Sequence, residues 1–186
     1  MNLILDTLKA LDESRGDDIE RWFEARRKES PPYIYTSVDL RHSGLRLAPV
    51  DTNLYPAGFN NLSPAGRTRA SRVFTHYLKD HFPAARKLLI IPENHTRNLA
   101  YRDNLAALQS LLSESGVQVE IGSLAAQAGE PIALETPSGA ALTQYPLQRQ
   151  DDRLVLENGF APDLILLNND MTSGVPEILQ HVSQPI

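Results

Sequence analysis

The stretch Lys87-Leu88-Leu89-Ile90-Ile91 contains a continuous apolar run, and the pattern of the residues that follow it decides the fold. Leu105, Leu108 and Leu112 recur at helical spacing, and Val117-Gln118-Val119-Glu120-Ile121 comes directly after them. A strand, a helix and a strand in this order form a βαβ unit, which implies parallel strands and a right-handed crossover. The sequence therefore predicts an α/β fold with an open, mostly parallel, Rossmann-like sheet flanked by helices.

The sheet is predicted to continue toward the carboxyl end. Leu164-Ile165-Leu166-Leu167 is apolar throughout, as expected of a strand covered on both faces. Two short runs, residues 132–136 and 141–145, lie around Pro137-Ser138-Gly139 and predict a small β-hairpin that makes an excursion from the main sheet. Residues 175–182 are expected to form a helix with Pro176 at its start.

The first part of the chain shows a helical pattern followed by β-rich runs. Apolar residues three and four apart predict two helices before Pro31-Pro32. Residues 33–38 and 45–50 are predicted strands, and Ser63-Pro64 supplies an N-cap and a first-turn proline for another helix. We expect residues 1–30 to form an N-terminal helical segment that packs on a main α/β domain of residues 31–186.

Composition excludes several classes of function. The chain has 186 residues and a net charge of -5, with its basic residues scattered, so nucleic acid is not an expected partner. No apolar run reaches the roughly 20 residues that span a bilayer, and no basic leader precedes an apolar core, so no membrane association and a cytoplasmic location are expected. There is no cysteine, which excludes thiolate metal sites and a cysteine nucleophile in these residues.

Polar residues follow the predicted strands, and ligands of open parallel sheets bind at the carboxyl ends of the strands. Arg97 offers a planar fork for a carboxylate and Glu93 could receive an ammonium group, which together would suit an amino acid. The predicted substrate-binding residues are Asp39, Arg41, Asp51, Asn53, Asn60, Asn61, Glu93, Asn94, His95, Arg97, Asn98, Asn168, Asn169 and Asp170.

Several of these residues also have a structural interpretation. An Asn or Asp after a strand commonly serves as a turn residue or helix cap, and Asn98 could cap the helix that contains Leu105. His95 is given a binding role, because no base partner is visible for acid–base catalysis. The loop of residues 51–62 is either a structured surface loop or a ligand-covering one.

Familiar motifs are absent from the sequence. It contains no GxGxxG, GxxxxGK[ST], HExxH or GxSxG pattern. His76 and His81 are five residues apart and point to different helix faces, so no metal site is predicted. Catalytic residues are therefore not assigned.

Four segments together resemble the proteobacterial-type glutamate–cysteine ligase family. They are residues 37–41, 47–62, 91–98 and 166–170, and the long loop Leu47-Ala48-Pro49-Val50-Asp51-Thr52-Asn53-Leu54-Tyr55-Pro56-Ala57-Gly58-Phe59-Asn60-Asn61-Leu62 is the most specific of them. The resemblance covers most of residues 33–186. It implies ATP-dependent joining of L-glutamate to L-cysteine, which gives γ-glutamylcysteine for glutathione biosynthesis.

The family is similar to ATP-grasp ligases, and its members are longer than this chain. The resemblance thus implies a pre-ATP-grasp domain at the amino-terminal end of a ligase, inactive alone, with ATP and Mg²⁺ held mainly by the remaining C-terminal domains. Arg41 and Arg97 would meet carboxylate or phosphate, and Glu93 and Asp170 an ammonium group. The alternatives are a stand-alone amino-acid or peptide binding module without catalysis and, with less support, an amide hydrolase or related enzyme that uses His95 with Asp39 or Asp170. A homo-oligomer is possible.

Overall fold

The computed structural model describes residues 3–93, 98–126 and 128–186. The chain divides into two units, unit 1 (Met1–Pro56) and unit 2 (Ala57–Ile186). The sequence had assigned residues 1–30 and 31–186 to separate parts, with the first packing on the second, and that packing stays a prediction.

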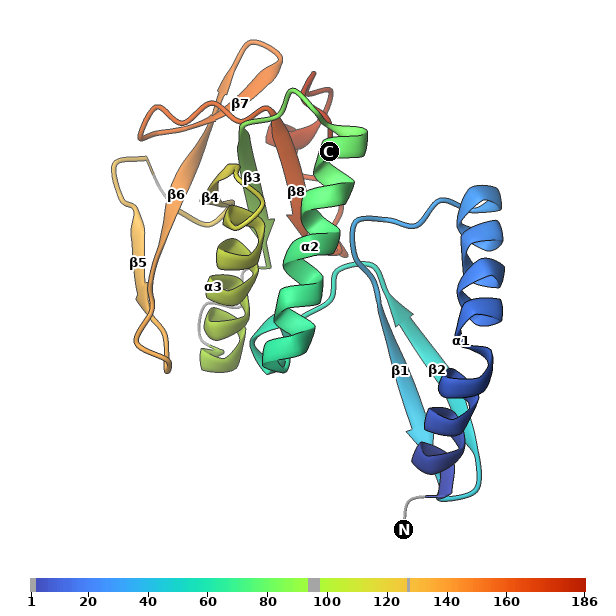
Figure 1. Cartoon of the computed structure of the whole chain (residues 1–186). Helices are drawn as coiled ribbons and strands as arrows, with labels where there is room; N and C mark the ends of the chain where they lie inside the picture. The colour runs from blue at the N-terminus through green and yellow to red at the C-terminus, as the bar shows by residue number, and fades with distance from the viewer. Residues whose placement is uncertain (1–2, 94–97, 127) are drawn as a thin grey trace. The chain divides into compact units, whose positions relative to one another are not determined.

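Unit 2 is built on one sheet whose strand order is β5-β6-β4-β3-β8, with β7 paired to β6 (Figure 1). β3 runs parallel to β4 and to β8, and β4 runs parallel to β6. β5 and β7 pair antiparallel with β6. The predicted α/β class and the mostly parallel sheet are thus confirmed, with strands β3 (Lys87–Pro92), β4 (Gln118–Ser123), β5 (Ile132–Glu135), β6 (Ala141–Gln150), β7 (Arg153–Leu156) and β8 (Leu164–Asn168).

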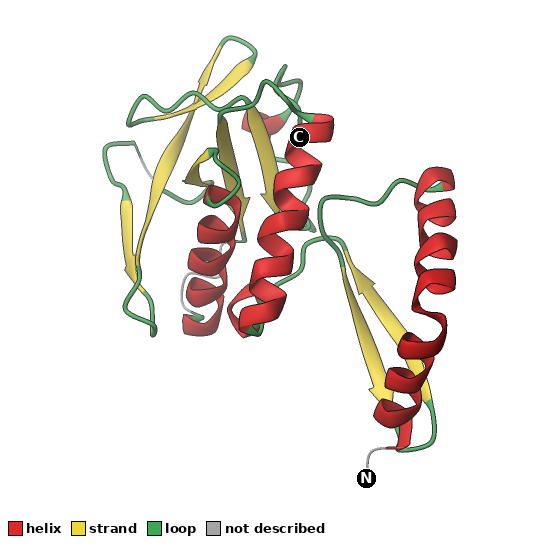
Figure 2. Ribbon diagram, viewed as in Figure 1, coloured by secondary structure: helices red, strands yellow, loops and turns green. Residues whose placement is uncertain are grey.

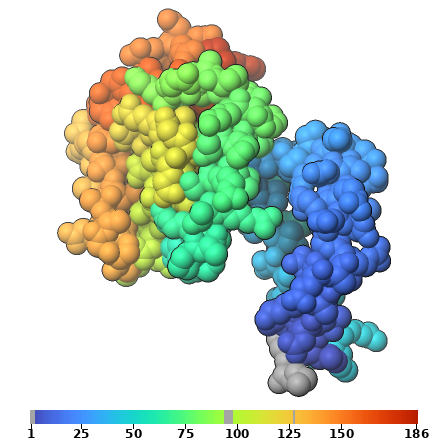
Figure 3. All heavy atoms as spheres, viewed as in Figure 1, coloured from blue at the N-terminus to red at the C-terminus, as the bar shows by residue number. Residues whose placement is uncertain are grey.

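Two helices, α2 (Pro64–His81) and α3 (Leu99–Ser113), lie side by side on one face of this sheet (Figures 1 and 2). In the space-filling view they form adjoining ridges of unit 2, green and yellow (Figure 3). Strand side chains alternate between the two faces. Leu89 and Ile91 point away from the helices and belong to a buried apolar cluster with Leu154, Leu156, Phe160 and Leu179. Both faces of β3 are therefore covered, which explains its unbroken apolar sequence.

The starts of both helices follow the capping pattern that their sequences predict. Ser63 precedes α2, and its Oγ accepts a hydrogen bond of 3.1 Å from the N–H of Gly66. Asn98 precedes α3, and its Oδ1 accepts one of 3.3 Å from the N–H of Tyr101. Each cap satisfies an N–H that has no partner inside the helix.

The predicted hairpin of residues 132–145 forms, and its second strand also adds to the main sheet, because residues 121–123 of β4 pair with residues 144–146 of β6. The predicted helix of residues 175–182 is wrong, since only a single 3₁₀ turn, η2 (Glu177–Leu179), forms. The guanidinium of Arg149 donates to the carbonyl oxygens of Ile178, Gln180 and His181. These carbonyl groups are engaged by a side chain instead of by a continuing helix.

Unit 1 contains helix α1 (Leu3–Glu29) and two strands, β1 (Ser37–His42) and β2 (Leu47–Asn53). Arg15 interrupts the helix with non-helical angles of φ −137° and ψ 15°, so two helical segments form as predicted. β1 and β2 pair antiparallel in a two-stranded sheet of their own. Both strands begin and end later in the chain than the predicted ranges of 33–38 and 45–50.

Among the residues that the structure describes, none of the helices combines the length and the apolar character that crossing a bilayer requires.

Candidate functional site

The carboxyl ends of β3 and β8 lie side by side in unit 2 and bring predicted site residues together. Pro92 pairs with Asn168 in the parallel register. Beyond that pair, the N–H of Glu93 donates to the carbonyl oxygen of Asn168 at 3.1 Å, and Nδ2 of Asn169 donates to the carbonyl oxygen of Pro92 at 3.1 Å. Two segments that are 75 residues apart in sequence thus leave the sheet at one edge.

Tyr101, in the first turn of α3, joins these two strand ends through its hydroxyl group. The hydroxyl accepts a hydrogen bond of 2.9 Å from the N–H of Glu93 and donates one of 3.0 Å to Oδ1 of Asn168. Tyr101 and Asn168 are both buried. The N–H of Tyr101 is bound by the cap residue Asn98. Because Tyr101 belongs to α3, its hydroxyl ties this helix to both strands. We name Glu93, Tyr101, Asn168, Asn169 and Asp170 the strand-end cluster.

The two carboxylates of the strand-end cluster come from different strands. The N–H of Asp170 donates to Oε1 of Glu93 at 3.0 Å, so the two residues are held next to each other. Glu93 is half-buried, whereas Asp170 is exposed. Neighbouring carboxylates at one sheet edge make a locally negative site that favours a cationic group such as an ammonium ion.

Asn169 and Asp170 also shape the turn after β8. Oδ1 of Asn169 accepts from the N–H of Met171 at 2.9 Å, and Oδ1 of Asp170 accepts from the N–H of Thr172 at 3.0 Å. Each side chain bonds the backbone two residues on, as Asn and Asp commonly do in turns. Met171 has a φ of 53°, in the left-handed region. Part of the polar character of this segment is therefore structural.

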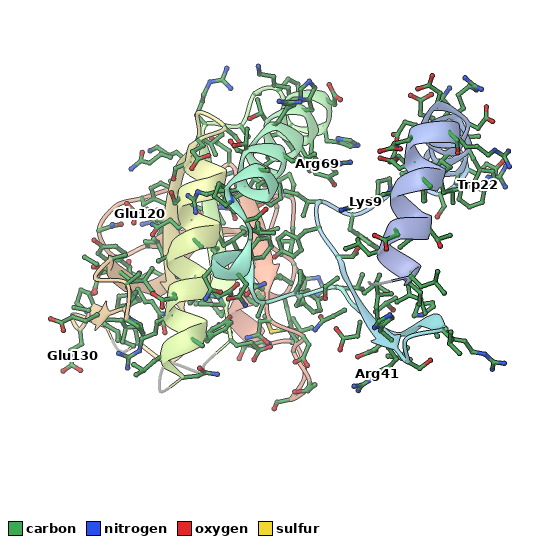
Figure 4. The ribbon with its side chains drawn as sticks, turned by 60° about the horizontal axis from the view of Figure 1, so that its bottom comes forward. Lys9, Trp22, Arg41, Arg69, Glu120 and Glu130 are labelled. Atoms are coloured by element: carbon green, nitrogen blue, oxygen red, sulfur yellow. The ribbon has the colours of Figure 1, made fainter. Side chains whose placement is uncertain are left out.

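Four predicted residues belong to unit 1, and the expectation that they follow strands of the main sheet is wrong. Asp39 and Arg41 lie inside β1, and Asp51 and Asn53 lie inside β2 (Figure 4 labels Arg41). Oδ1 of Asn53 accepts a hydrogen bond of 2.7 Å from the N–H of Tyr55. The two runs form a separate hairpin because each finds its backbone partners in the other. Their role in substrate binding stays a prediction.

Asn60 and Asn61 lie in a one-turn helix, η1 (Phe59–Asn61), which α3 holds in place. Oδ1 of the buried Asn104 accepts hydrogen bonds from the N–H groups of Gly58 at 2.7 Å and Phe59 at 3.0 Å. The second half of the predicted loop is thus a structured segment in unit 2. Gly58 has a φ of 96°, which favours glycine at this position.

A cavity of about 390 Å³ lies beside η1. Its lining includes Asn60, Arg67, Asp103 and Ser138. Oδ1 of Asp103 accepts hydrogen bonds from Oγ of Ser138 at 2.7 Å and from its N–H at 3.1 Å. The hydroxyl of Ser138 holds the pKa of Asp103 below its usual value. Arg67 donates to Oε1 of Glu114 at 3.0 Å, so the charged groups of this cavity are engaged within the protein.

Three predicted residues, Asn94, His95 and Arg97, lie outside the described residues. Two other residues were missed by the sequence reasoning. Tyr101 was not singled out, because an aromatic residue in an apolar helix is usually core. Asn104 stands directly before Leu105 on the buried face of α3, and a polar residue at such a position is the signal that could have identified it. Within the described part of the chain, no group of three or more His, Asp or Glu side chains is arranged to hold a metal ion.

Comparison with known proteins places this geometry in a family. None of the curated proteins matches the chain. A crystal structure at 1.90 Å resolution, of a candidate gamma-glutamylcysteine synthetase from Methylobacillus flagellatus KT, matches with a TM-score of 0.86 and 43% sequence identity, over 97% of this chain. The match covers 42% of that protein, so this chain spans less than half of its length. The family model of glutamate-cysteine ligase (GshA) matches residues 11–186. The chain therefore belongs to the glutamate-cysteine ligase family.

Proposed function

We propose that this chain is the amino-terminal part of a glutamate–cysteine ligase and forms one wall of its substrate cleft. The strand-end cluster would bind the ammonium group of an amino-acid substrate through Glu93 and Asp170. The observation that carries this assignment is the hydrogen bond from the N–H of Asp170 to Oε1 of Glu93, which holds these two acidic residues next to each other at the edge where parallel sheets bind ligands.

The reaction that the family implies has two steps. A γ-carboxylate oxygen of glutamate attacks the γ-phosphorus of ATP and ADP leaves, which gives γ-glutamyl phosphate. The amine nitrogen of cysteine then attacks the γ-carbonyl carbon, the bond to phosphate breaks, and the nitrogen loses a proton. The products are γ-glutamylcysteine, ADP and phosphate. In this scheme the strand-end cluster orients glutamate by its ammonium group, away from the reacting γ-carboxylate.

Two features of the described residues support a binding role without phosphate chemistry. The sequence has no glycine-rich phosphate loop. Within the described residues, no group of three or more His, Asp or Glu side chains is arranged to hold a metal ion, so these residues do not fit Mg²⁺. We assign ATP and Mg²⁺ to the part of the ligase that this chain does not include. A cytoplasmic location fits such an enzyme.

The test uses the full product of the gene that encodes this chain, with γ-glutamylcysteine measured by mass spectrometry. Glu93→Gln and Asp170→Asn each keep one side-chain oxygen that can accept a hydrogen bond, and they remove the negative charge. Loss of one charge-assisted interaction with an ammonium group, about 1.5–3 kcal/mol, should raise the KM for glutamate about 10- to 150-fold. The KM for ATP should stay the same, because the cluster is assigned to the amino acid.

Glu130→Gln is the matched control, because Glu130 is exposed and lies outside the strand-end cluster (Figure 4). It should behave like the natural protein. An unchanged KM for glutamate in both cluster variants would contradict the assignment of the site. Saturable binding of glutamate without any product would contradict ligation and favour the alternative, a binding module without catalysis.

A further inference from the structure

Unit 1 leaves an apolar helix face exposed. No described residue of α1 is buried, and the exposed fractions of Leu8, Leu11, Trp22 and Phe23 are 47%, 42%, 58% and 44%. At the interruption of the helix, a groove of about 390 Å³ is lined by Leu11, Arg15, Asp18, Ile19, Trp22 and Phe23. Figure 4 labels Trp22 on this helix. Four of the six lining residues are apolar, so the groove suits apolar side chains.

The two-stranded sheet of unit 1 is similarly uncovered. Every described residue of β2 is exposed, and so is β1 apart from Ser37. The exposed apolar side chains of the hairpin are Val38, Leu40, Leu45, Leu47 and Val50. A lone two-stranded hairpin is marginally stable in water, and an amphipathic helix gains most of its stability from packing its apolar face. Unit 1 therefore has the properties of a segment that completes its folding against another surface.

Unit 2 does not present a matching apolar surface in its described residues. Of the 18 large apolar side chains that are exposed, 13 belong to residues 1–56. The other five lie on different elements, and single exposed apolar residues are normal for a protein surface. They are Leu62, Val73, Leu99, Val175 and Ile186. The exposed large apolar side chains of the described residues are thus concentrated in unit 1.

We propose that the apolar face of α1 and the β1–β2 hairpin dock on the part of the glutamate–cysteine ligase that follows the region covered by this chain. The inference rests on the proposed function. The related protein from Methylobacillus flagellatus KT aligns with 97% of this chain, unit 1 included for the most part, and 58% of its own length lies outside the match. In this relative, further polypeptide therefore accompanies the same segments.

Hydrogen exchange with peptide-level mass spectrometry tests the proposal on residues 3–29. It compares the chain of residues 1–186 with the full product of its gene. The amides of α1 should exchange on the order of 100-fold more slowly in the full product, because opening the helix there also separates a packed apolar interface. Equal exchange in both proteins would overturn the proposal. Light scattering of the 186-residue chain adds a second readout, since protection that rises with dimer formation would make a second copy the partner.

Protection of α1 in a monomeric 186-residue chain would also overturn the proposal, because the same chain would then cover the face. A gene product that ends at Ile186 would also overturn the proposal, because no further polypeptide would then be present to cover the face. Ligase activity, measured on the same full product, separates the two ideas. An active ligase with unprotected α1 refutes only the docking inference, whereas protected α1 without ligase activity refutes only the proposed function.

The variant Leu11→Glu locates the docking surface, with Glu24→Gln as control on an exposed position of the same helix outside the groove. Leucine and glutamate have similar helix propensities, so the helix itself is retained. Leu11→Glu should speed the exchange of α1 about 10-fold or more in the full product and leave it unchanged in the 186-residue chain. An unchanged rate in the full product would place the contact elsewhere.

Discussion

Replacing Tyr101 by phenylalanine tests how the strand-end cluster is held together. Phenylalanine keeps the buried ring and removes the hydroxyl, which accepts from the N–H of Glu93 at 2.9 Å and donates to Oδ1 of Asn168 at 3.0 Å. Each intramolecular hydrogen bond contributes about 0.5–1.5 kcal/mol net. Two of them give an expected loss of about 1–3 kcal/mol in the free energy of unfolding of unit 2.

The assay must report on unit 2. The only tryptophan, Trp22, belongs to unit 1, so its fluorescence is unsuitable. Hydrogen exchange of the β3 and β8 amides is the direct readout, and a loss of 1–3 kcal/mol makes that exchange about 5- to 150-fold faster. Tyr77→Phe is the control, because the hydroxyl of Tyr77 makes no hydrogen bond to a described residue. Exchange in Tyr101→Phe that matches this control would refute the bridging role.

Two further predictions concern unit 2. The hydrogen bonds from Ser138 lower the pKa of Asp103, so their stabilising effect is fully present above the ordinary pKa of 3.8 and is lost as the pH falls below it. The dependence of unfolding on pH below about 4 should therefore be weaker in Ser138→Ala, measured by acid titration with circular dichroism, and an unchanged profile would contradict this. Asn104→Ala removes the acceptor of the Gly58 and Phe59 N–H groups and should destabilise unit 2 by about 1–3 kcal/mol in urea unfolding. A change within about 0.3 kcal/mol would show that η1 does not depend on this side chain.

Most of the fold of unit 2 could be predicted because its signals are local. The apolar runs of β3 and β8, the spacing of Leu105, Leu108 and Leu112, and the caps Ser63 and Asn98 each depend on neighbouring residues. The helix predicted for residues 175–182 does not form. Arg149, which lies on β6 and is distant in sequence, binds carbonyl groups of this segment. No local pattern contains such a contact.

Part of the candidate site could also be predicted from signals that are local in the sequence. Glu93, Asn168, Asn169 and Asp170 were expected at the ends of strands and are found there. The structure adds that the two strands are neighbours, so that their parallel register brings these ends together. Asp39 and Arg41 were expected at the end of a strand and lie inside one. A β-rich run does not reveal which other run it pairs with. Tyr101 was missed because its position in the sequence is that of a core residue.

The sequence by itself determined the α/β class, the βαβ unit around β3, the helix starts and the family resemblance, because hydrophobic period, capping residues and motifs are properties of contiguous residues. Only the tertiary structure decided that β1 and β2 form a sheet of their own, that β6 joins the main sheet, and that Tyr101 bridges Glu93 and Asn168. These outcomes depend on which backbone groups meet across long separations in the chain. Pairing of that kind is chosen by the packing of the whole unit and leaves no mark within any single segment.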